Sequence, residues 1–221
     1  GAEIHLNKDE IIAKEKIKSL IDDLKNKGKN PYVIPAGGTN EIGLFGYIAA
    51  FQEILEDEKK LKIKFDHIVF ASSSYGTQCG LILGNKIFKG ENRKGKPKKI
   101  HGISVCKLFL DSTSKVDDKE KMLILMRNFC EKNGLDFELE SEDVIYDQRF
   151  NSSGYAILSE DDKNGIDIFA KNEAIVLDPV YSGRAAGGLL KMLENNEFEK
   201  DDNVLFIHTG GYPALFTNLY K

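Results

Sequence analysis

The segment from His67 to Gly80, HIVFASSSYGTQCG, limits the possible fold of this chain more than any other part of the sequence. It starts with an apolar run typical of a buried strand, continues as a loop of small and hydroxylated residues, and ends in residues that suit a helix start. Loop amides, hydroxyls and a helix N-terminus bind anions well when they lie together. The segment therefore predicts an α/β fold with a phosphate-binding loop after this strand.

The same alternation of strands and helices continues along the chain. We expect strands at 32–34, 68–71, 100–106 and 204–208, with a short strand or extended piece at 174–177. Helices are expected from residue 7 to about 28 and at 43–55, 78–88, 119–132, 161–171 and 185–194, with a short one after the last strand. This order predicts a three-layer α/β fold, in which helices cover both faces of a mostly parallel sheet. Ligands of such sheets bind at the carboxyl ends of the strands.

Charge and composition exclude several classes of function. The chain has 221 residues and a net charge of −4, whereas a nucleic-acid partner requires a basic face. No apolar stretch approaches the roughly 20 residues that span a bilayer, and we expect no leader segment. The three cysteines and four histidines lack metal-ligand spacing. We therefore expect a cytoplasmic protein with reduced thiols and with no metal, nucleic-acid partner or membrane span.

Three further segments follow predicted strands, and each alone has a plain structural explanation. The turn at 37–40 fits simple turn chemistry or the second wall of a ligand site, since glycine allows close approach. Tyr181 follows the rigid Asp178-Pro179 turn and suits either a core or a site. The glycines after Thr209 form a tight turn in both cases, and His208 is expected to be structural. The serine loop matches neither a P-loop, nor a dinucleotide fingerprint, nor a hydrolase nucleophile elbow.

Taken together, the segments resemble one family of enzymes. IPAGGTNEIGLFGY, ASSSYGTQCGL, LDPVYSGRAAGGL and VLFIHTGGYPALF, in this order, closely resemble the D-cysteine desulfhydrase and 1-aminocyclopropane-1-carboxylate deaminase family. Its members depend on pyridoxal 5′-phosphate (PLP) and have the tryptophan-synthase-β-like fold, also called fold type II. The resemblance implies that residues 30–221 form the large PLP-binding domain. Residues 1–29 would be the remnant of a small domain that covers the cofactor.

The resemblance also implies roles for individual residues. The PLP phosphate would be held by the loop that consists of Ser72, Ser73, Ser74, Tyr75, Gly76 and Thr77. Tyr155 and Tyr181 match the two active-site tyrosines and are the expected catalytic residues. Thr209, and with it Ser182, would contact the cofactor as neutral hydrogen-bonding groups near the pyridine nitrogen. Deaminases of the family typically have Glu and Leu where this chain has Ser182 and Thr209, which favours the desulfhydrase activity.

One part of the family pattern has no match in the chain. The Schiff-base lysine and the Ser-Asn segment that binds the substrate carboxylate both precede the matched region in the family. Roughly a hundred residues, the size of a small domain, would be absent. Lys86, Lys89 and Lys107 follow helical or strand patterns and do not replace that lysine. The expected identity is thus a fragment that is inactive alone, from an enzyme that is a homodimer when complete.

The resemblance leaves three functions to compare. The first is β-elimination of thiol or sulfide from D-cysteine-like amino acids, which gives pyruvate and ammonia. The second is deamination of 1-aminocyclopropane-1-carboxylate, also a small amino-acid substrate. The third, from a different class, is a non-catalytic, shortened protein that binds phosphate-bearing ligands or acts in assembly. We expect the first.

Overall fold

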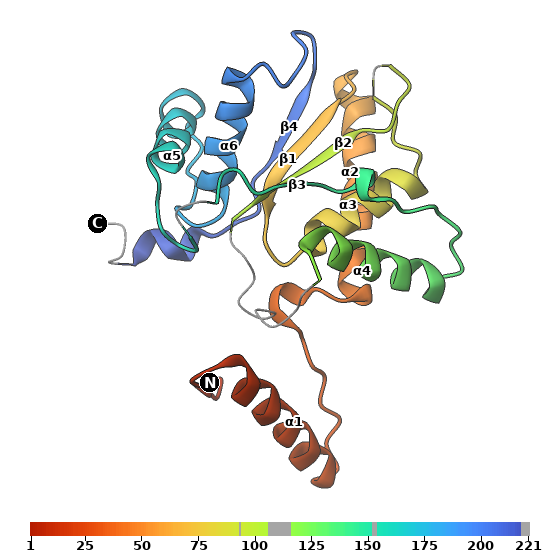
Figure 1. The fold of residues 1–221 in the computed structure, drawn as a ribbon, viewed down its shortest axis with the longest axis vertical. Helices are drawn as coiled ribbons and strands as arrows, with labels where there is room; N and C mark the ends of the chain where they lie inside the picture. The colour runs from red at the N-terminus through yellow and green to blue at the C-terminus, as the bar shows by residue number, and fades with distance from the viewer. Residues whose placement is uncertain (93, 106–115, 152–153, 218–221) are drawn as a thin grey trace.

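The computed structural model describes residues 1–92, 94–105, 116–151 and 154–217. Its described strands form one parallel sheet in the order β3-β2-β1-β4 (Figure 1). The strands are β1 (His67–Ser72), β2 (Lys99–Ser104), β3 (Ile145–Asp147) and β4 (Val204–Ile207). The expectation of a three-layer α/β fold with a parallel sheet is confirmed.

Strand β1 suits the centre of this sheet because it contains a continuous apolar run, Ile68 to Ala71. All six of its residues are buried, and it pairs with β2 on one side and β4 on the other. A parallel strand that is covered on both faces needs such a continuous apolar run, without the alternation of a half-exposed strand. The loop after β1 therefore leaves the sheet at its middle, between the neighbouring strand ends.

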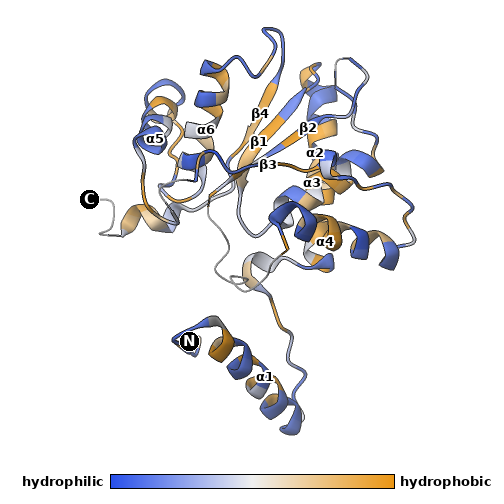
Figure 2. Ribbon diagram, in the orientation of Figure 1, coloured by the Kyte–Doolittle hydropathy of each residue, from blue (hydrophilic) through white to orange (hydrophobic). Residues whose placement is uncertain are grey.

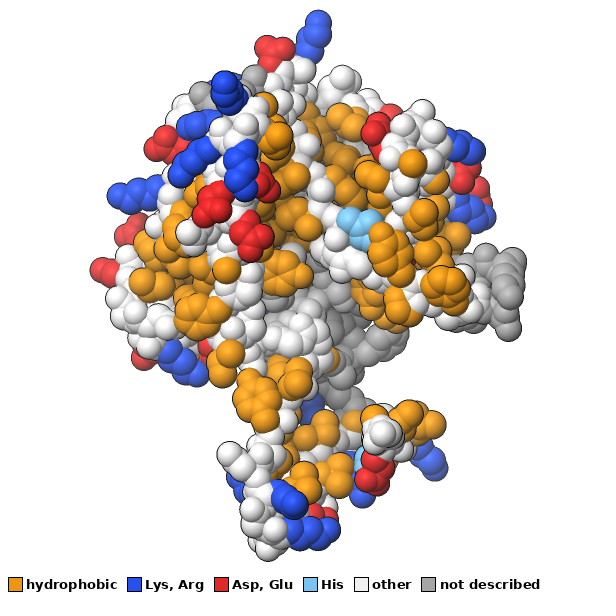
Figure 3. Space-filling view, turned by 180° about the vertical axis from the view of Figure 1, so that it is seen from behind, with side chains coloured by type: hydrophobic (Ala, Val, Ile, Leu, Met, Phe, Trp, Pro, Cys, Tyr) orange, Lys and Arg blue, Asp and Glu red, His pale blue; other side chains and the backbone are white. Residues whose placement is uncertain are grey.

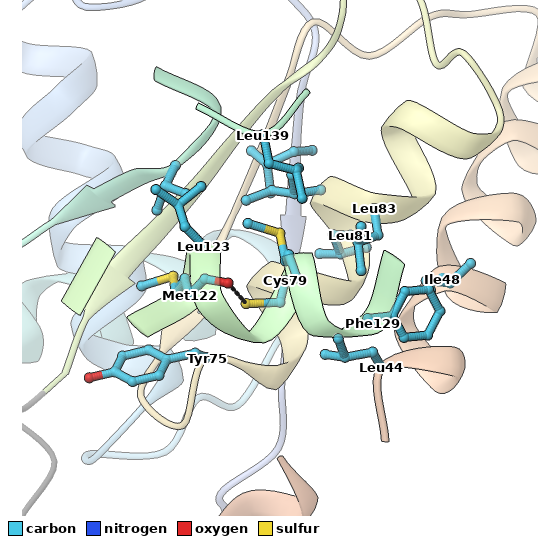
Figure 4. Packing of buried hydrophobic residues seen from close by; sticks show 14 of the residues in the cluster. Leu44, Ile48, Tyr75, Cys79, Leu81, Leu83, Met122, Leu123, Phe129 and Leu139 are labelled. Carbon is cyan, nitrogen blue, oxygen red and sulfur yellow. Dashed lines mark hydrogen bonds between the residues drawn. The ribbon is translucent and has the colours of Figure 1, made fainter. Parts of the chain in front are cut away.

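Helices cover both faces of the sheet. On one face lie α2 (Glu41–Leu61), α3 (Gly76–Ile87) and α4 (Asp118–Lys132), which share the larger hydrophobic cluster. Figure 4 shows this packing, with Leu44 and Ile48 of α2 near Leu81 and Leu83 of α3. On the other face, α5 (Glu160–Glu173) packs on α6 (Ser182–Glu194), and α6 contacts the sheet. Figure 2 shows the apolar colouring that runs through the strands between these two layers.

Two glycines let α2 and α3 approach closely. A Cβ atom on Gly80 would lie 2.4 Å from Cβ of Tyr47, and one on Gly84 would lie 2.5 Å from Cβ of Phe51. Real Cβ contacts are not this short, so larger residues at these positions would separate the two helices. The close contact brings Tyr47 of α2 toward the start of α3.

The N-terminal helix α1 (Glu10–Asn26) lies apart from the rest of the molecule (Figure 1). Asp9 caps it, two residues later than the sequence indicated, because the Asp9 carboxylate accepts the amide of Ile12 at 2.9 Å. Several apolar side chains at the start of the chain and on α1 are exposed, and Figure 3 shows hydrophobic side chains on the surface of this detached part. They are Ile4, Leu6, Ile11, Ile12, Ile17 and Leu24.

One strand expected from the sequence, at 32–34, is absent from the sheet, and one observed strand, β3, was not expected. Residues 32–34 are extended but do not pair in the sheet, and Ile34 is exposed. The piece at 174–177, expected as a short strand or an extended piece, is extended, and its Val176 is exposed. No pattern in the sequence predicts β3, which has only three residues. Such a short strand forms because β2 offers it a paired edge, and its own residues carry too little pattern to predict it.

Short 3-10 helices complete the described structure at Ala36–Gly38 (η1), Ser141–Asp143 (η3) and Tyr212–Phe216 (η4). Among the described residues, no helix combines the length and the apolar character that a membrane crossing demands. The described part of the chain also contains no group of three or more His, Cys, Asp or Glu side chains that could hold a metal ion.

Candidate functional site

A hollow of about 170 Å³ lies at the carboxyl end of β1. It brings together three loops that are far apart in the sequence: the loop after β1, the turn before α6 and the turn after β4. Its lining consists of Tyr47, Ala71, Ser72, Ser73, Ser74, Tyr75, Thr77, Tyr181, Thr209 and Gly211. The lining therefore includes most of the residues that the sequence predicted for one site.

The loop after β1 contributes its residues in different ways. The Ser72 hydroxyl donates to Oε1 of Gln78 at 2.9 Å and is buried. The Tyr75 ring packs at the edge of the larger hydrophobic cluster, and its hydroxyl, which points away from the cluster in Figure 4, donates to Oδ1 of Asp118 at 2.7 Å. Neither of these two hydroxyls is directed at the hollow, so Ser72 and Tyr75 shape the loop. Ser74 and Thr77 also line the hollow, and their hydroxyls make no hydrogen bond to another described residue.

The loop has the geometry of an anion site because α3 starts directly after it. Tyr75 adopts a left-handed conformation with φ of 69°, which turns the chain from the strand into the helix. The first amides of a helix have no partner within the helix and point away from its N-terminus. Gly76 is the first residue of α3, so these amides and the flanking hydroxyls face the same end of β1.

The turn at 37–40 packs against this loop from outside the hollow. Gly37 has φ of 67°, and a Cβ atom on it would lie 2.1 Å from Oγ of Ser74. On the other side, a Cβ atom on Gly76 would lie 2.9 Å from Oγ1 of Thr39. The Thr39 hydroxyl is buried and has no partner among the described residues. The turn therefore supports the loop, and the Thr39 hydroxyl has the capacity to donate a further hydrogen bond.

Tyr181 is held by a compact turn built around Asp178. The buried Asp178 carboxylate accepts the amides of Val180 at 2.8 Å, Tyr181 at 2.8 Å and Ser182 at 2.7 Å. Gly211, after β4, lies so close that a Cβ atom on it would be 2.3 Å from Cγ of Asp178. This arrangement fixes the backbone of Tyr181 and joins its turn to the last loop of the site.

Ser182 does not fit the expected role of a cofactor contact. Its side chain is fully buried, its hydroxyl donates to Oδ1 of Asp178 at 2.6 Å, and its oxygen accepts the Asp178 amide at 2.9 Å. Both contacts belong to the Asp178 turn, and Ser182 is absent from the lining of the hollow as the described residues define it. The sequence could place Ser182 next to Tyr181 but could not show that it faces inward.

The two tyrosines meet directly. The hydroxyl oxygens of Tyr155 and Tyr181 lie 2.7 Å apart, and their rings pack edge to face with centroids at 6.2 Å. Tyr155 is 41% exposed and reaches the hollow through Tyr181. One hydroxyl donates to the other, so the pair can pass a proton or share one with a bound molecule.

Thr209 lines the hollow two residues after the end of β4, and its neighbour His208 holds the turn in place. The Gly210 amide donates to Nδ1 of His208 at 3.0 Å, so Nε2 carries the hydrogen and donates to the carbonyl of Val176, also at 3.0 Å. These bonds fix the turn that presents Thr209. Among the described residues, the lining includes neither a lysine nor a carboxylate.

The structure adds Tyr47, which the sequence did not indicate as a site residue. It comes from α2 and packs against the larger core cluster while it also lines the hollow. In the sequence, a tyrosine within an apolar helix resembles any core tyrosine. Only the close contact of α2 with α3 brings it to the site.

Comparison with known proteins gives the family. The family model described as pyridoxal-phosphate dependent enzyme matches residues 1–210. D-cysteine desulfhydrase of Serratia proteamaculans is 33% identical over 91% of this chain and 57% of its own length. A bifunctional D-cysteine desulfhydrase/1-aminocyclopropane-1-carboxylate deaminase of Arabidopsis thaliana, named as mitochondrial, is 34% identical over 98% of this chain and 51% of its own length.

A solved structure of an ACC deaminase homologue superposes with a TM-score of 0.76 at 30% identity, over 95% of this chain and 58% of the other. The chain thus spans between half and three fifths of the length of these relatives.

Proposed function

This chain belongs to the pyridoxal-phosphate dependent enzyme family, and we propose that it is the cofactor-binding part of a lyase that acts on D-cysteine or a similar amino acid. The overall reaction converts D-cysteine and water to pyruvate, ammonia and hydrogen sulfide. The observation that carries the proposal is the single hollow in which the loop after β1, Tyr181 and Thr209 meet.

The residues of the hollow suit PLP. The phosphate is a dianion with several acceptor oxygens, and the start of α3 with Ser74 and Thr77 offers amides and hydroxyls to it. The Thr39 hydroxyl behind the loop, which has no partner among the described residues, is a further hydrogen-bond donor. Ser72, Ser73, Tyr75 and Gly76 form the backbone of this cradle. When bound, PLP supplies an electron sink for the α-carbon of an amino acid.

The remaining site residues have separate tasks. Tyr155 and Tyr181 orient the substrate and carry a proton to the leaving sulfur, because their hydroxyls already share a hydrogen bond. Thr209 presents a neutral hydroxyl to the cofactor ring. A carboxylate at the same position would instead keep the pyridine nitrogen protonated. Since Ser182 is turned toward Asp178, the contact with the ring falls to Thr209 alone.

The second candidate is the deaminase, and the structural likeness to an ACC deaminase homologue supports it. Thr209 in place of the family deaminases' leucine favours the desulfhydrase. Ser182, the other distinguishing position, acts through the Asp178 turn and influences the choice only indirectly.

We also propose that residues 1–29 belong to a second, smaller domain, and 30–221 to the large domain. The exposed apolar side chains of α1, its separation from the sheet and the share of the relatives' length that the chain spans support this division. By resemblance, the base that removes the α-proton is a lysine in the part of the relatives that this chain does not cover. The complete enzyme is proposed to be a homodimer in the cytoplasm, which agrees with the free, buried thiols of Cys79 and Cys130.

The experiment supplies the chain with PLP and with the part of the Serratia relative that it does not cover. D-cysteine, L-cysteine and 1-aminocyclopropane-1-carboxylate are then compared as substrates. Sulfide and pyruvate from D-cysteine are the expected products. Formation of 2-oxobutanoate alone would support the deaminase. Binding of PLP without either product would favour the non-catalytic function.

A further inference from the structure

Arg184, on the first turn of α6, is a fully buried cation that joins several segments around the tyrosine pair. Its side chain has 0% exposure and is among the largest that the structure buries completely. Nη1 donates to the carbonyls of Val105 at 2.7 Å and Gly154 at 2.8 Å, and Nη2 donates to the carbonyl of Ile157 at 2.6 Å. Nη2 also contacts Oδ2 of Asp162 at 3.1 Å.

Two of these carbonyls flank Tyr155. Gly154 and Ile157 lie on either side of it in a short segment with unusual backbone geometry, since φ is 91° at Gly154 and 57° at Ala156. Tyr155 is 41% and Ile157 57% exposed, so burial of apolar surface fixes this segment less than it fixes a core strand. From the buried side, the guanidinium of Arg184 binds the backbone carbonyls of this segment before and after Tyr155.

Stability alone does not account for a charge in this position. Burial of an ion pair such as Arg184 and Asp162 costs desolvation that their attraction repays only in part, and well-packed apolar residues often serve as well. A guanidinium does provide a planar fork of donors with fixed directions, which lysine cannot reproduce. The fork binds the carbonyl of Val105, the residue after β2, and two carbonyls of the segment at 154–157 in one rigid arrangement.

Asp162 completes the arrangement. Its Oδ2 accepts from Arg184 and also from the amide of Ser159 at 2.9 Å, within the capping box at the start of α5. The start of α5 and the segment at 154–157 are thus tied to the same guanidinium. Tyr181 lies three residues before Arg184, at the start of the same helix.

We propose that Arg184 is a positioning residue, which sets the Tyr155 hydroxyl against Tyr181 by holding the carbonyls of Gly154 and Ile157. The functional meaning of this role rests on the proposed function, in which the tyrosine pair faces the substrate. Arg184 touches neither substrate nor cofactor, and its effect passes through the backbone of the Tyr155 segment.

The test replaces Arg184 with Lys and measures hydrogen exchange at the amides of residues 155–157 in the full chain. Lysine keeps the charge opposite Asp162 but cannot hold both flanking carbonyls. Exchange at these amides should rise at least tenfold. In 19F NMR of the 3-fluorotyrosine-labelled chain, Tyr155→Phe shifts the Tyr181 resonance in the native background, and this shift should disappear when Arg184 is Lys. Unchanged exchange together with a retained shift would overturn the proposal.

Lys98 provides a matched control. It is another buried cation, with Nζ bonded to Glu58 at 2.6 Å and to the carbonyls of Phe65 and Glu91 at 3.1 and 2.9 Å. Lys98→Met should lower the unfolding midpoint but leave exchange at 155–157 and the tyrosine coupling unchanged. The same local effect from Lys98→Met would mean that general destabilisation explains the result, and would overturn the positioning role.

A second variant covers the case in which Arg184→Lys does not fold. Asp162→Asn retains an acceptor for the guanidinium but removes its counter-charge, and should raise exchange at 155–157 at least threefold. No change in a folded Asp162→Asn protein would contradict the proposal. None of these readouts needs PLP, so a failure of PLP binding would refute the proposed function and leave the role of Arg184 in the chain intact.

Discussion

The hydroxyl oxygens of Tyr155 and Tyr181 lie 2.7 Å apart, although the two residues are 26 positions apart in the sequence. Each is fixed by a different buried charge. Asp178 holds the turn that carries Tyr181, and Arg184 holds the carbonyls that flank Tyr155. Asp178 lies four residues before Ser182, the first residue of α6, and Arg184 lies two residues after it. One helix start therefore organises the reactive side of the site.

Removal of either hydroxyl of the pair should reduce turnover without unfolding the protein. Tyr155→Phe and Tyr181→Phe in the complemented enzyme should each lower kcat for D-cysteine by roughly 100-fold, the usual contribution of a positioned proton donor. The double variant should lose little more than either single one, because the two hydroxyls act as a unit. Tyr32→Phe, at an exposed tyrosine outside the site, is the control. Additive losses in the double variant would argue against a shared proton.

Gly37→Ala should weaken phosphate binding more than its backbone strain explains. Gly37 has φ of 67°, and its new Cβ would lie 2.1 Å from Oγ of Ser74. Gly28 has φ of 70° with no atom within 4 Å, so Gly28→Ala has the same strain and no contact. Both should cost about 1 kcal/mol of unfolding free energy from the left-handed backbone.

Only Gly37→Ala should reduce affinity for pyridoxamine 5′-phosphate, by about tenfold, as expected when one hydrogen bond to a charged group is lost. Binding titrations of both variants provide the measurement. Equal affinities would show that Ser74 has no part in the phosphate site.

The last loop offers a second glycine pair. A Cβ on Gly211 would lie 2.3 Å from Cγ of Asp178, whereas one on Gly210 would meet nothing within 4 Å. Both residues have positive φ, 105° and 97°. Gly211→Ala should therefore cost about 1–3 kcal/mol more in unfolding free energy than Gly210→Ala, the usual penalty for overpacking. Urea denaturation measures the difference, and similar losses for the two variants would contradict the close contact with Asp178.

Acid should destabilise the protein through a buried histidine pair on the face of the sheet near α6. His67 Nδ1 lies 2.9 Å from His101 Nε2, and His67 Nε2 lies 3.0 Å from Asp202. Burial lowers the pKa of His101 to about 4, and His67 and Lys99 contribute to the shift. Burial also lowers the pKa of His67, although the bond to Asp202 opposes this effect.

Because both histidines bind protons more readily in the unfolded chain, this part of the stability is complete above about pH 6.5 and is lost as the pH falls toward 4. His101→Gln keeps a hydrogen-bond donor for His67 but does not titrate. The slope of the unfolding free energy against pH should therefore fall by up to about 1.4 kcal/mol per pH unit. His5→Gln, in the exposed N-terminal segment, is the control. The measurement is the free energy of unfolding between pH 4 and 7; an unchanged slope in His101→Gln would refute the assignment.

The sequence was sufficient for those parts of the fold in which local pattern and burial agree. Strand β1 and its loop could be predicted because residues 68–71 form a continuous apolar run and the loop residues suit a turn. The strand expected at 32–34 has the same apolar character, but no strand of the sheet is adjacent to pair with it. Pairing partners, which the local sequence does not contain, decide such cases.

In the candidate site, too, some residues could be predicted from the local sequence and others depend on tertiary contacts. Ser74, Thr77, Tyr181 and Thr209 could be found because each follows a strand or a rigid turn, and strand ends meet at one edge. Tyr47 was missed because helix packing brings it to the site, and Ser182 was misplaced because its direction depends on hydrogen bonds to Asp178. Side-chain direction within a helix start is a tertiary property.

The most direct test of the account compares binding of pyridoxamine 5′-phosphate and pyridoxamine to the full chain by equilibrium dialysis. Neither compound has an aldehyde, so neither forms covalent adducts with surface lysines, and the two differ only in the phosphate. The account predicts at least tenfold tighter binding of the phosphate ester, with the difference reduced in Thr77→Val and retained in Thr217→Val. Equal affinities, or a preference that Thr77→Val leaves unchanged, would contradict the assignment of the loop after β1 as the phosphate site.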